Sequence, residues 1–137
     1  VDDEFEQTWM LLGDLRSSRG DLEGAIEAYQ RALEVKESCD VRRVVGALLA
    51  QQGSFEEAYT FLRDSLALDR CSDFGQRWEM YRVLAVAAAN IGRPEEALEA
   101  AAIALELAPE AQKPAVQQVI DQLQGTSEEP IEPLGQP

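Results

Sequence analysis

Internal repetition constrains the fold of this chain more than any other feature of its sequence. Glycine recurs at Gly20, Gly53 and Gly92, at intervals of 33 and 39 residues. Each of these glycines has a small residue seven positions before it and an alanine five positions after it. The residues are Gly13, Gly46 and Ala85 before, and Ala25, Ala58 and Ala97 after. A unit of about 34 residues, with a short insertion near residues 71–76, fits this spacing and predicts a stack of three similar units.

Each unit divides into two helices at its central glycine. Glycine adopts a positive φ at low cost and is therefore common where a helix ends. Asp21 and Ser54 follow two of the glycines, where their side-chain oxygens can cap the next helix. In the third unit Pro94 suits the first turn of a helix, where its missing N–H costs nothing. The sequence therefore predicts three helical hairpins.

Small and large residues indicate how the two helices of a hairpin pack. The small residues seven before and five after each glycine are expected where the paired helices approach closely. The large residues expected to fill the remaining space are Trp9, Tyr29, Leu62 and Tyr81. The small positions thus recur in all three units.

These units resemble the tetratricopeptide repeat. The first unit matches that family's pattern through Trp9, Leu12, Gly13, Gly20, Ala25, Tyr29 and Ala32. The second unit departs from it, with Arg42 in place of the tryptophan and Ser65 in place of the last alanine. The third carries Tyr81, Leu84, Ala85, Gly92, Ala97, Ala101, Ala104 and Pro109. The resemblance implies an all-α fold, a right-handed α-α superhelix of three helix pairs plus a capping helix.

The chain is expected to divide into three parts. The repeats occupy residues 1–111, with units at about 6–38, 39–72 and 78–111. Residues 112–125 are expected to form a capping helix, because one face is apolar and the other is polar. The apolar face consists of Val116, Val119, Ile120 and Leu123. Residues 126–137 are rich in proline and glutamate and are predicted to form an extended acidic tail.

The composition disfavours several classes of function. The chain has no histidine, and 26 acidic residues against 12 Lys and Arg give a formal net charge of −14. Without histidine, imidazole-based catalysis and imidazole metal ligands are excluded. Paired acids such as Glu56 and Glu57 are typical of the first turn of a helix rather than of a catalytic site. The acidic surface disfavours nucleic acid and anionic membranes, so we expect no catalytic residue, no metal and no cofactor.

Cys39 and Cys71 are the only cysteines and stand in corresponding turns between units. A disulfide between them is one option, but the prediction is two free thiols in a reducing compartment. The start of the chain does not have the pattern of a signal peptide. No apolar run reaches the length of about eighteen residues that a membrane span needs. The sequence therefore predicts a cytoplasmic chain, and leaves open whether further sequence precedes Val1.

The resemblance also implies where a partner would bind, because in this family the first helix of each pair lines a concave groove. In each unit the groove positions follow one helical stripe with gaps of three, four and three residues. The stripe comprises Gln7, Met10, Asp14 and Ser17 in the first unit, Asp40, Arg43, Ala47 and Ala50 in the second, and Glu79, Arg82, Val86 and Ala89 in the third. Polar residues stand at the next position, namely Ser18, Gln51 and Asn90.

The apolar and amide residues of this lining favour a peptide ligand. A shallow apolar floor for aliphatic side chains is expected from Ala47, Ala50, Val86 and Ala89. Gln51 and Asn90 can both donate and accept hydrogen bonds, which suits an extended peptide backbone. In the alternative interpretation a neighbouring helix or the tail covers this floor.

The charged residues of the lining allow two interpretations. Arg43 and Arg82 hold equivalent positions and could bind acidic side chains of a partner. Alternatively, they pair with Asp40, Glu79 or Asp14 on their own surface. Some family members clamp acidic chaperone tails with lysines and asparagines on this face. That clamp is not expected here, because Met10, Asp14 and Ala47 replace the residues it needs.

The leading hypothesis is a non-catalytic adaptor or scaffold that binds a protein or extended peptide in the groove. The alternative is a self-assembling protein whose groove takes up its own or a neighbour's tail through Ile131 and Leu134, forming a homo-oligomer. An assembly factor for a larger complex and an RNA-reading helical repeat are further options, and the net charge disfavours the second.

Overall fold

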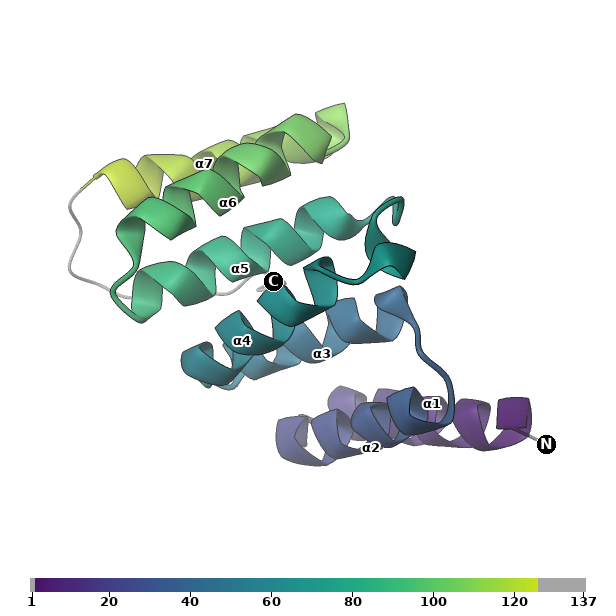
Figure 1. Ribbon diagram of the computed structural model, residues 1–137. Helices are drawn as coiled ribbons and strands as arrows, with labels where there is room; N and C mark the ends of the chain where they lie inside the picture. The colour runs from purple at the N-terminus through teal and green to yellow at the C-terminus, as the bar shows by residue number, and fades with distance from the viewer. Residues whose placement is uncertain (1, 126–137) are drawn as a thin grey trace.

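The computed structural model describes residues 2–125, and every regular element in this range is helical (Figure 1). The elements are α1 (Asp2–Ser18), α2 (Leu22–Val35), α3 (Cys39–Gln51), α4 (Phe55–Leu66), the 3-10 helix η1 (Asp69–Cys71), α5 (Arg77–Asn90), α6 (Pro94–Leu107), the 3-10 helix η2 (Glu110–Gln112) and α7 (Lys113–Gln124). The predicted all-helical fold is confirmed. The expectations for residues 126–137, including Ile131 and Leu134, lie outside the described residues.

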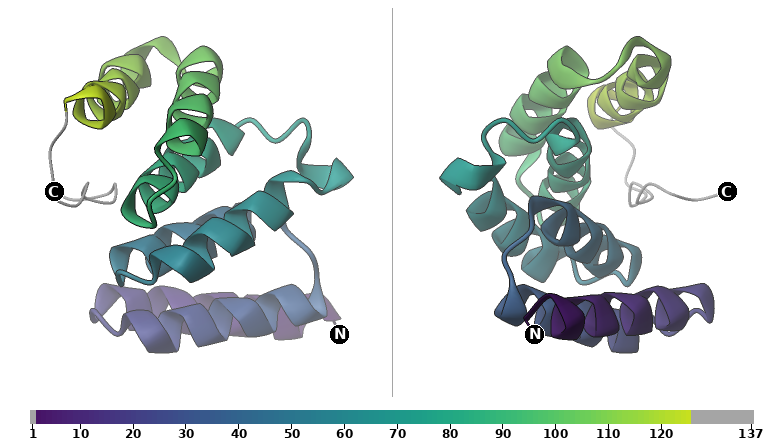
Figure 2. Two further views of the ribbon diagram at one scale, coloured as in Figure 1. Left: turned by 60° about the vertical axis from the view of Figure 1, so that its left-hand side comes forward. Right: turned by 90° about the vertical axis from the view of Figure 1, so that its right-hand side faces the viewer.

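The α-helices pair in chain order and the pairs stack along one direction (Figure 2). Hairpins α1–α2, α3–α4 and α5–α6 follow one another, and α7 packs against α6. Between hairpins, α3 packs against α2, and α5 packs against both α3 and α4. In Figure 1, α2 and α4 lie in front of α1 and α3. The first helices of the hairpins therefore share one side of the stack.

The turns inside the hairpins follow the glycine pattern. Gly20, Gly53 and Gly92 have φ values of 79°, 88° and 82°, in the left-handed region that glycine enters without a steric penalty. The Asp21 carboxylate accepts a hydrogen bond of 3.0 Å from the Gly24 N–H. The predicted cap at Ser54 is wrong, because its side chain makes no such bond. Ser38, by contrast, accepts a hydrogen bond of 3.2 Å from the Val41 N–H from an extended backbone conformation that Ser54 does not adopt.

The close approach of the paired helices explains why positions 13 and 46 are glycines. A Cβ added to Gly13 would lie 2.7 Å from Cε1 of Tyr29, and a Cβ added to Gly46 would overlap the side chain of Leu62. Real Cβ atoms do not approach other atoms this closely. The expectation that these positions are small because the helices meet there is therefore confirmed.

The core runs continuously through the three hairpins. Val45, Leu62 and Met80 are fully buried and belong to one cluster that spans α3, α4 and α5. A second cluster packs Trp78 against the end of the stack, through Ala104, Ala108 and Val116. The apolar face predicted for the last helix is thus placed against its neighbours.

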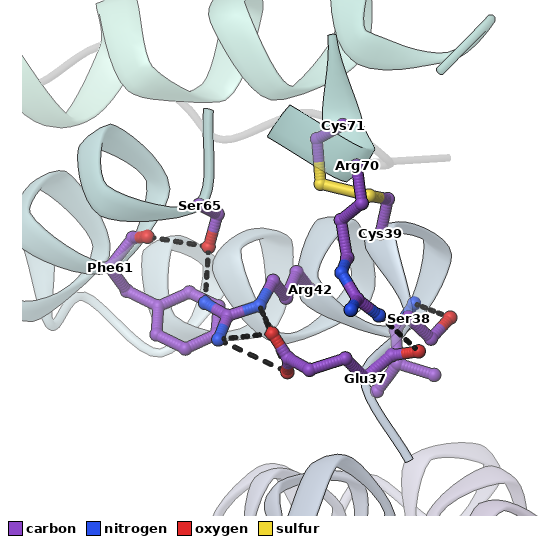
Figure 3. Close-up of polar contacts among 9 residues, drawn as sticks. Glu37, Ser38, Cys39, Arg42, Phe61, Ser65, Arg70 and Cys71 are labelled. Carbon is purple, nitrogen blue, oxygen red and sulfur yellow. Dashed lines mark hydrogen bonds and ion pairs between the residues drawn. A yellow bond between two sulfur atoms is a disulfide. The ribbon is translucent and has the colours of Figure 1, made fainter. Parts of the chain in front are cut away.

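The two departures from the repeat pattern in the second unit contact each other (Figure 3). Nη1 of Arg42 donates a hydrogen bond of 2.9 Å to Oγ of Ser65, and Ser65 donates one of 2.7 Å to the Phe61 carbonyl. Nη2 of Arg42 also lies 2.9 Å from Oε2 of Glu37. A polar network therefore occupies the position that tryptophan and alanine hold in the first unit.

A disulfide joins Cys39, the first residue of α3, to Cys71 in η1 (Figure 3). The prediction of two free thiols is therefore wrong. Because α3 and α4 pack as a helical hairpin, the start of α3 lies beside the 3-10 helix that follows α4, and the two Cα atoms are 5.6 Å apart, within the range that a disulfide spans. Nη1 of Arg70 donates to the Glu37 carbonyl at 3.5 Å, so the same corner is held by polar contacts as well.

Candidate functional site

The predicted groove residues differ widely in how accessible they are. Five are exposed, namely Gln7, Asp14, Ser18, Asp40 and Gln51, whereas Ala50, Arg82 and Val86 are buried. The remaining seven are intermediate, namely Met10, Ser17, Arg43, Ala47, Glu79, Ala89 and Asn90. The accessible part of the predicted surface therefore lies mainly on α1 and α3, with a smaller part at the end of α5.

The apolar floor is smaller than the sequence predicts. Ala50 and Val86 both have an exposed fraction of 0%, so a partner side chain cannot reach them. Ala47 and Ala89 remain partly exposed while they pack against the core. The expected floor of four residues is thus corrected to two, because the stacked helices enclose the other positions.

Arg43 forms ion pairs on its own surface. Its Nη2 lies 2.8 Å from Oδ1 of Asp40, and its Nη1 lies 3.4 Å from Oε1 of Glu79. The first pair lies within α3, and the second joins α3 to α5. Of the two interpretations, pairing within the chain is the one that the structure shows.

The guanidinium of Arg82 is buried, and its polar partners satisfy only part of it. Its exposed fraction is 7%, and its guanidinium lies over the Trp78 ring at 5.4 Å from the ring centre. Nη2 lies 4.0 Å from Oε1 of Glu79, and Nε is buried without a hydrogen-bond partner. Burial lowers the pKa of Arg82 to about 10, although the Glu79 carboxylate acts in the opposite direction. The structure therefore places Arg82 in the packing between helices rather than on an open surface.

Two polar groove residues already hold partners. The Tyr29 hydroxyl donates to Oδ1 of Asp14, which joins α2 to α1. Burial, and then this hydrogen bond, raise the pKa of Tyr29 above its ordinary range. Nδ2 of Asn90 donates to the Val86 carbonyl at 2.8 Å. Sequence reasoning missed Tyr29 as the partner of Asp14, because the two residues lie on different helices.

The described cavities lie elsewhere in the fold. One of about 160 Å³ is lined by α4, α5 and α6, with Tyr59, Glu96 and Ile103 among its residues. Two more, of about 320 and 380 Å³, lie between α2 and α4 and share Glu57. None of these three cavities is lined by a predicted groove residue. The predicted groove residues are therefore separate from these three cavities.

Two other kinds of site are absent from the described part of the chain. Between residues 2 and 125, no group of three or more Asp, Glu, Cys or His side chains could hold a metal ion. None of the helices in that range combines the length and the apolar character that a membrane-spanning segment needs.

This chain resembles known proteins in part of its sequence and in its fold. Residues 6–39 match the model of the tetratricopeptide repeat family. The MamA protein has a TM-score of 0.76 and 22% identity over 90% of this chain, which spans 64% of the MamA chain. The Arabidopsis OM64 TPR domain has a TM-score of 0.77 and 16% identity over 93% of this chain and 100% of that domain. PilF of Pseudomonas aeruginosa has a TM-score of 0.56 and 20% identity over 89% of this chain and 68% of its own.

The search of curated protein sequences finds no match. The structural likenesses are all below 25% identity, so they establish architecture. The sequence match covers the first hairpin, in which Trp9, Gly13 and Tyr29 hold their expected places. The first unit is therefore a tetratricopeptide repeat, and the described chain has the fold of a tetratricopeptide-repeat solenoid.

Proposed function

We propose that this chain is a non-catalytic interaction module that binds an extended segment of another polypeptide across the first helices of its hairpins. The observation that carries the proposal is the accessible stripe on α1 and α3. This stripe comprises Gln7, Met10, Asp14, Ala47 and Gln51. Exposed polar residues alternate there with partly exposed apolar ones, on rigid helices that the hairpin stack holds in place.

The chemistry of the stripe favours a partner with small aliphatic side chains. Met10 and Ala47 offer apolar surface, and Gln51 can both donate to and accept from a peptide backbone. A partner carboxylate would have to displace Asp40 and Glu79 from Arg43. We therefore propose that aliphatic contacts and backbone hydrogen bonds, rather than acidic side chains, give most of the affinity.

A peptide display library tests this function. Peptides selected on the immobilised full chain should bind an Ala47→Arg variant at least about tenfold more weakly, a loss of about 1.4 kcal/mol. The matched control is Ala102→Arg, because Ala102 is an exposed alanine on α6, away from the stripe. The proposal fails if no peptide is enriched, or if the two variants lose affinity equally. Ala50 is unsuitable for this test, because a larger side chain there would disturb the core.

The tail hypothesis stays a prediction. It requires residues 126–137 to occupy the same stripe, which would compete with an external peptide. A truncated chain that ends at Gly125 should then bind the selected peptides more tightly than the full chain. It should also show a lower oligomeric state. Equal affinity and equal mass for the two chains would contradict it.

The cytoplasmic location also stays a prediction, and the disulfide between Cys39 and Cys71 argues against it. Disulfides persist in oxidising compartments and are rare in the reducing cytosol. We propose that the chain works under oxidising conditions. Cells quenched in acid and treated with a thiol-reactive mass tag provide the test. Unlabelled protein supports the oxidised state in the cell, whereas addition of two tags before reduction contradicts it.

A further inference from the structure

A cleft lies between α2 and α4, the two helices in front of the stack in Figure 1. It consists of the adjoining cavities of about 320 and 380 Å³, which share Gln30, Leu49 and Glu57. The large apolar side chains in its lining are Ile26, Leu49 and Phe61, one each from α2, α3 and α4. A cavity of about 150 Å³ suffices to bind benzene, so this cleft has room for a large apolar side chain. We call it the α2–α4 cleft.

Every charged side chain that lines the α2–α4 cleft within residues 2–125 is acidic. These acids are exposed and comprise Glu23 and Glu27 on α2, and Glu56, Glu57 and Asp64 on α4. The helix dipole favours an acid in the first turn of a helix, which accounts for Glu23, Glu56 and Glu57. Glu27 and Asp64 lie beyond the first turn, where this effect has faded. The helix termini therefore explain only part of the set.

The third hairpin shows how such a carboxylate can be compensated within the chain. Glu96 and Glu57 each stand four residues after the central glycine of their unit. The Tyr59 hydroxyl donates to Oε2 of Glu96, and Nη1 of Arg93 donates to its Oε1 at 3.1 Å. The hydrogen bond from Tyr59, and then that from Arg93, lower the pKa of Glu96 against the effect of desolvation. Arg63 lines the same cavity, so the acids there face cations of the chain itself.

The α2–α4 cleft lacks these compensating groups. One unit earlier, the positions of Tyr59, Arg63 and Arg93 are held by Ile26, Gln30 and Ser54. All three replacements line the cleft. None of them carries a positive charge, and Ile26 cannot donate a side-chain hydrogen bond. The α2–α4 cleft is thus the counterpart of the neighbouring cavity without its cations.

Most of the acids in the cleft remain without a partner in the described part of the chain. Those with no ion pair or side-chain hydrogen bond to a described residue are Glu23, Glu27 and Glu57. Asp64 lies 3.8 Å from Nε of Arg63, and Glu56 attracts Arg93. The described acids do not converge as metal ligands do. Their spread over two helices suits an extended cationic partner, which would relieve the repulsion between them.

We propose that the α2–α4 cleft docks a basic segment of a partner protein, in which lysines or arginines flank one large apolar side chain. The cations pair with the carboxylates of Glu23, Glu27 and Glu57. The apolar side chain occupies the cavity beside Leu49 and Phe61. The inner stripe lies on α1 and α3, so this inference goes beyond the function proposed above and does not depend on it. A chain with both surfaces can hold two partners of different chemistry.

A fluorescein-labelled peptide of one phenylalanine between two runs of four lysines tests the cleft, by fluorescence anisotropy with the full chain. Gln30→Arg places in the cleft the cation that Arg63 supplies in the neighbouring cavity, and should weaken binding at least about tenfold. The matched control is Gln118→Arg, which changes the net charge equally at an exposed position on α7. It should weaken binding less than about twofold. Far-ultraviolet circular dichroism verifies that each variant keeps its helices.

Removal of carboxylates provides a second test. Glu23→Gln/Glu57→Gln removes two unpaired acids of the cleft and should weaken binding of the same peptide at least about tenfold. Glu95→Gln/Glu106→Gln is the matched control, because it removes the same charge from exposed positions on α6 outside the cleft. This control should change the affinity less than about threefold.

The apolar part of the cleft is tested by the peptide itself. A peptide with alanine in place of the phenylalanine should bind the wild-type chain at least about fivefold more weakly. The inner stripe is tested separately, because Ala47→Arg should affect the phenylalanine peptide no more than its control Ala102→Arg does.

Four outcomes would overturn the proposal. The first is no binding of the phenylalanine peptide to the wild-type chain up to about 1 mM. The second is an equal loss in a cleft variant and its control, which would mean general attraction to an acidic chain. The third is equal affinity for the phenylalanine and alanine peptides. The fourth is a larger loss in Ala47→Arg than in Ala102→Arg, which would place the peptide on the inner stripe.

Discussion

Leu15 and Leu48 hold the same position in successive hairpins, yet Leu15 is 47% exposed and Leu48 is 6% exposed. Both lie on the first helix of a hairpin. Helix α3 packs against α2, whereas the described residues supply no such neighbour for this face of α1. The difference shows that burial in a repeat protein depends on the neighbouring unit and not on the residue alone.

The first two hairpins also differ in how they fill equivalent positions. Trp9 and Ala32 in the first unit are replaced by Arg42 and Ser65 in the second. The second unit replaces an apolar pair by a hydrogen-bonded one. It also has a disulfide that the first unit lacks. The second hairpin therefore depends on specific bonds where the first depends on apolar packing.

A large loss of stability is expected when the disulfide is removed. The double variant Cys39→Ala/Cys71→Ala should lower the free energy of unfolding by about 3 to 4 kcal/mol, because the bond closes a long loop in the unfolded chain. Urea denaturation followed by circular dichroism measures this. Dithiothreitol should produce a similar loss in the wild-type chain and none in the double variant. A wild-type chain that is insensitive to the reductant would show that the bond is absent.

The comparison of Leu48 with Leu15 can be tested directly. Leu48→Ala should cost about 2 to 5 kcal/mol, because it leaves a cavity in the core. Leu15→Ala should change the stability of the isolated chain by less than about 0.5 kcal/mol. Both are measured by urea denaturation followed by circular dichroism. Equal losses would mean that the face of α1 is as well covered as that of α3.

Gly46→Ala tests the close approach of α3 and α4. The added Cβ would overlap Leu62, which has an exposed fraction of 0% and no room to move. We expect a loss of about 1 to 3 kcal/mol, measured by thermal denaturation. Gly75→Ala is the control, because a Cβ there would meet nothing within 4 Å. Similar losses for the two variants would contradict the packing argument.

Ser65→Ala tests the polar network of the second unit. The change leaves Nη1 of Arg42 without its serine partner while Glu37 still pairs with the guanidinium. We expect a loss of about 1 kcal/mol. Ser18→Ala is the control, because its hydroxyl is exposed and bonds only within α1. The double variant Arg42→Trp/Ser65→Ala should recover part of the loss, because it restores the pair of the first unit.

Much of the architecture follows from local features of the sequence. The positive φ of Gly20, Gly53 and Gly92 was predictable, because a glycine at a helix end serves the same purpose wherever the helix packs. The small residues Gly13 and Gly46 were equally predictable from the repeat. The polar outward face of α7 follows from its own periodicity. Each of these features depends only on residues within one helix or one hairpin.

Accessibility and pairing depend on contacts between hairpins, so only the tertiary structure decides them. The sequence placed Ala50, Val86 and Arg82 on a helical stripe, but stacking encloses all three. Stacking also brings Arg43 to Glu79, and the pairing of α3 with α4 brings Cys39 to Cys71, although each pair is more than thirty residues apart in the chain. The repeating sequence determines which residues share a face of each helix. The packing of successive units against one another determines which of those faces another molecule can reach.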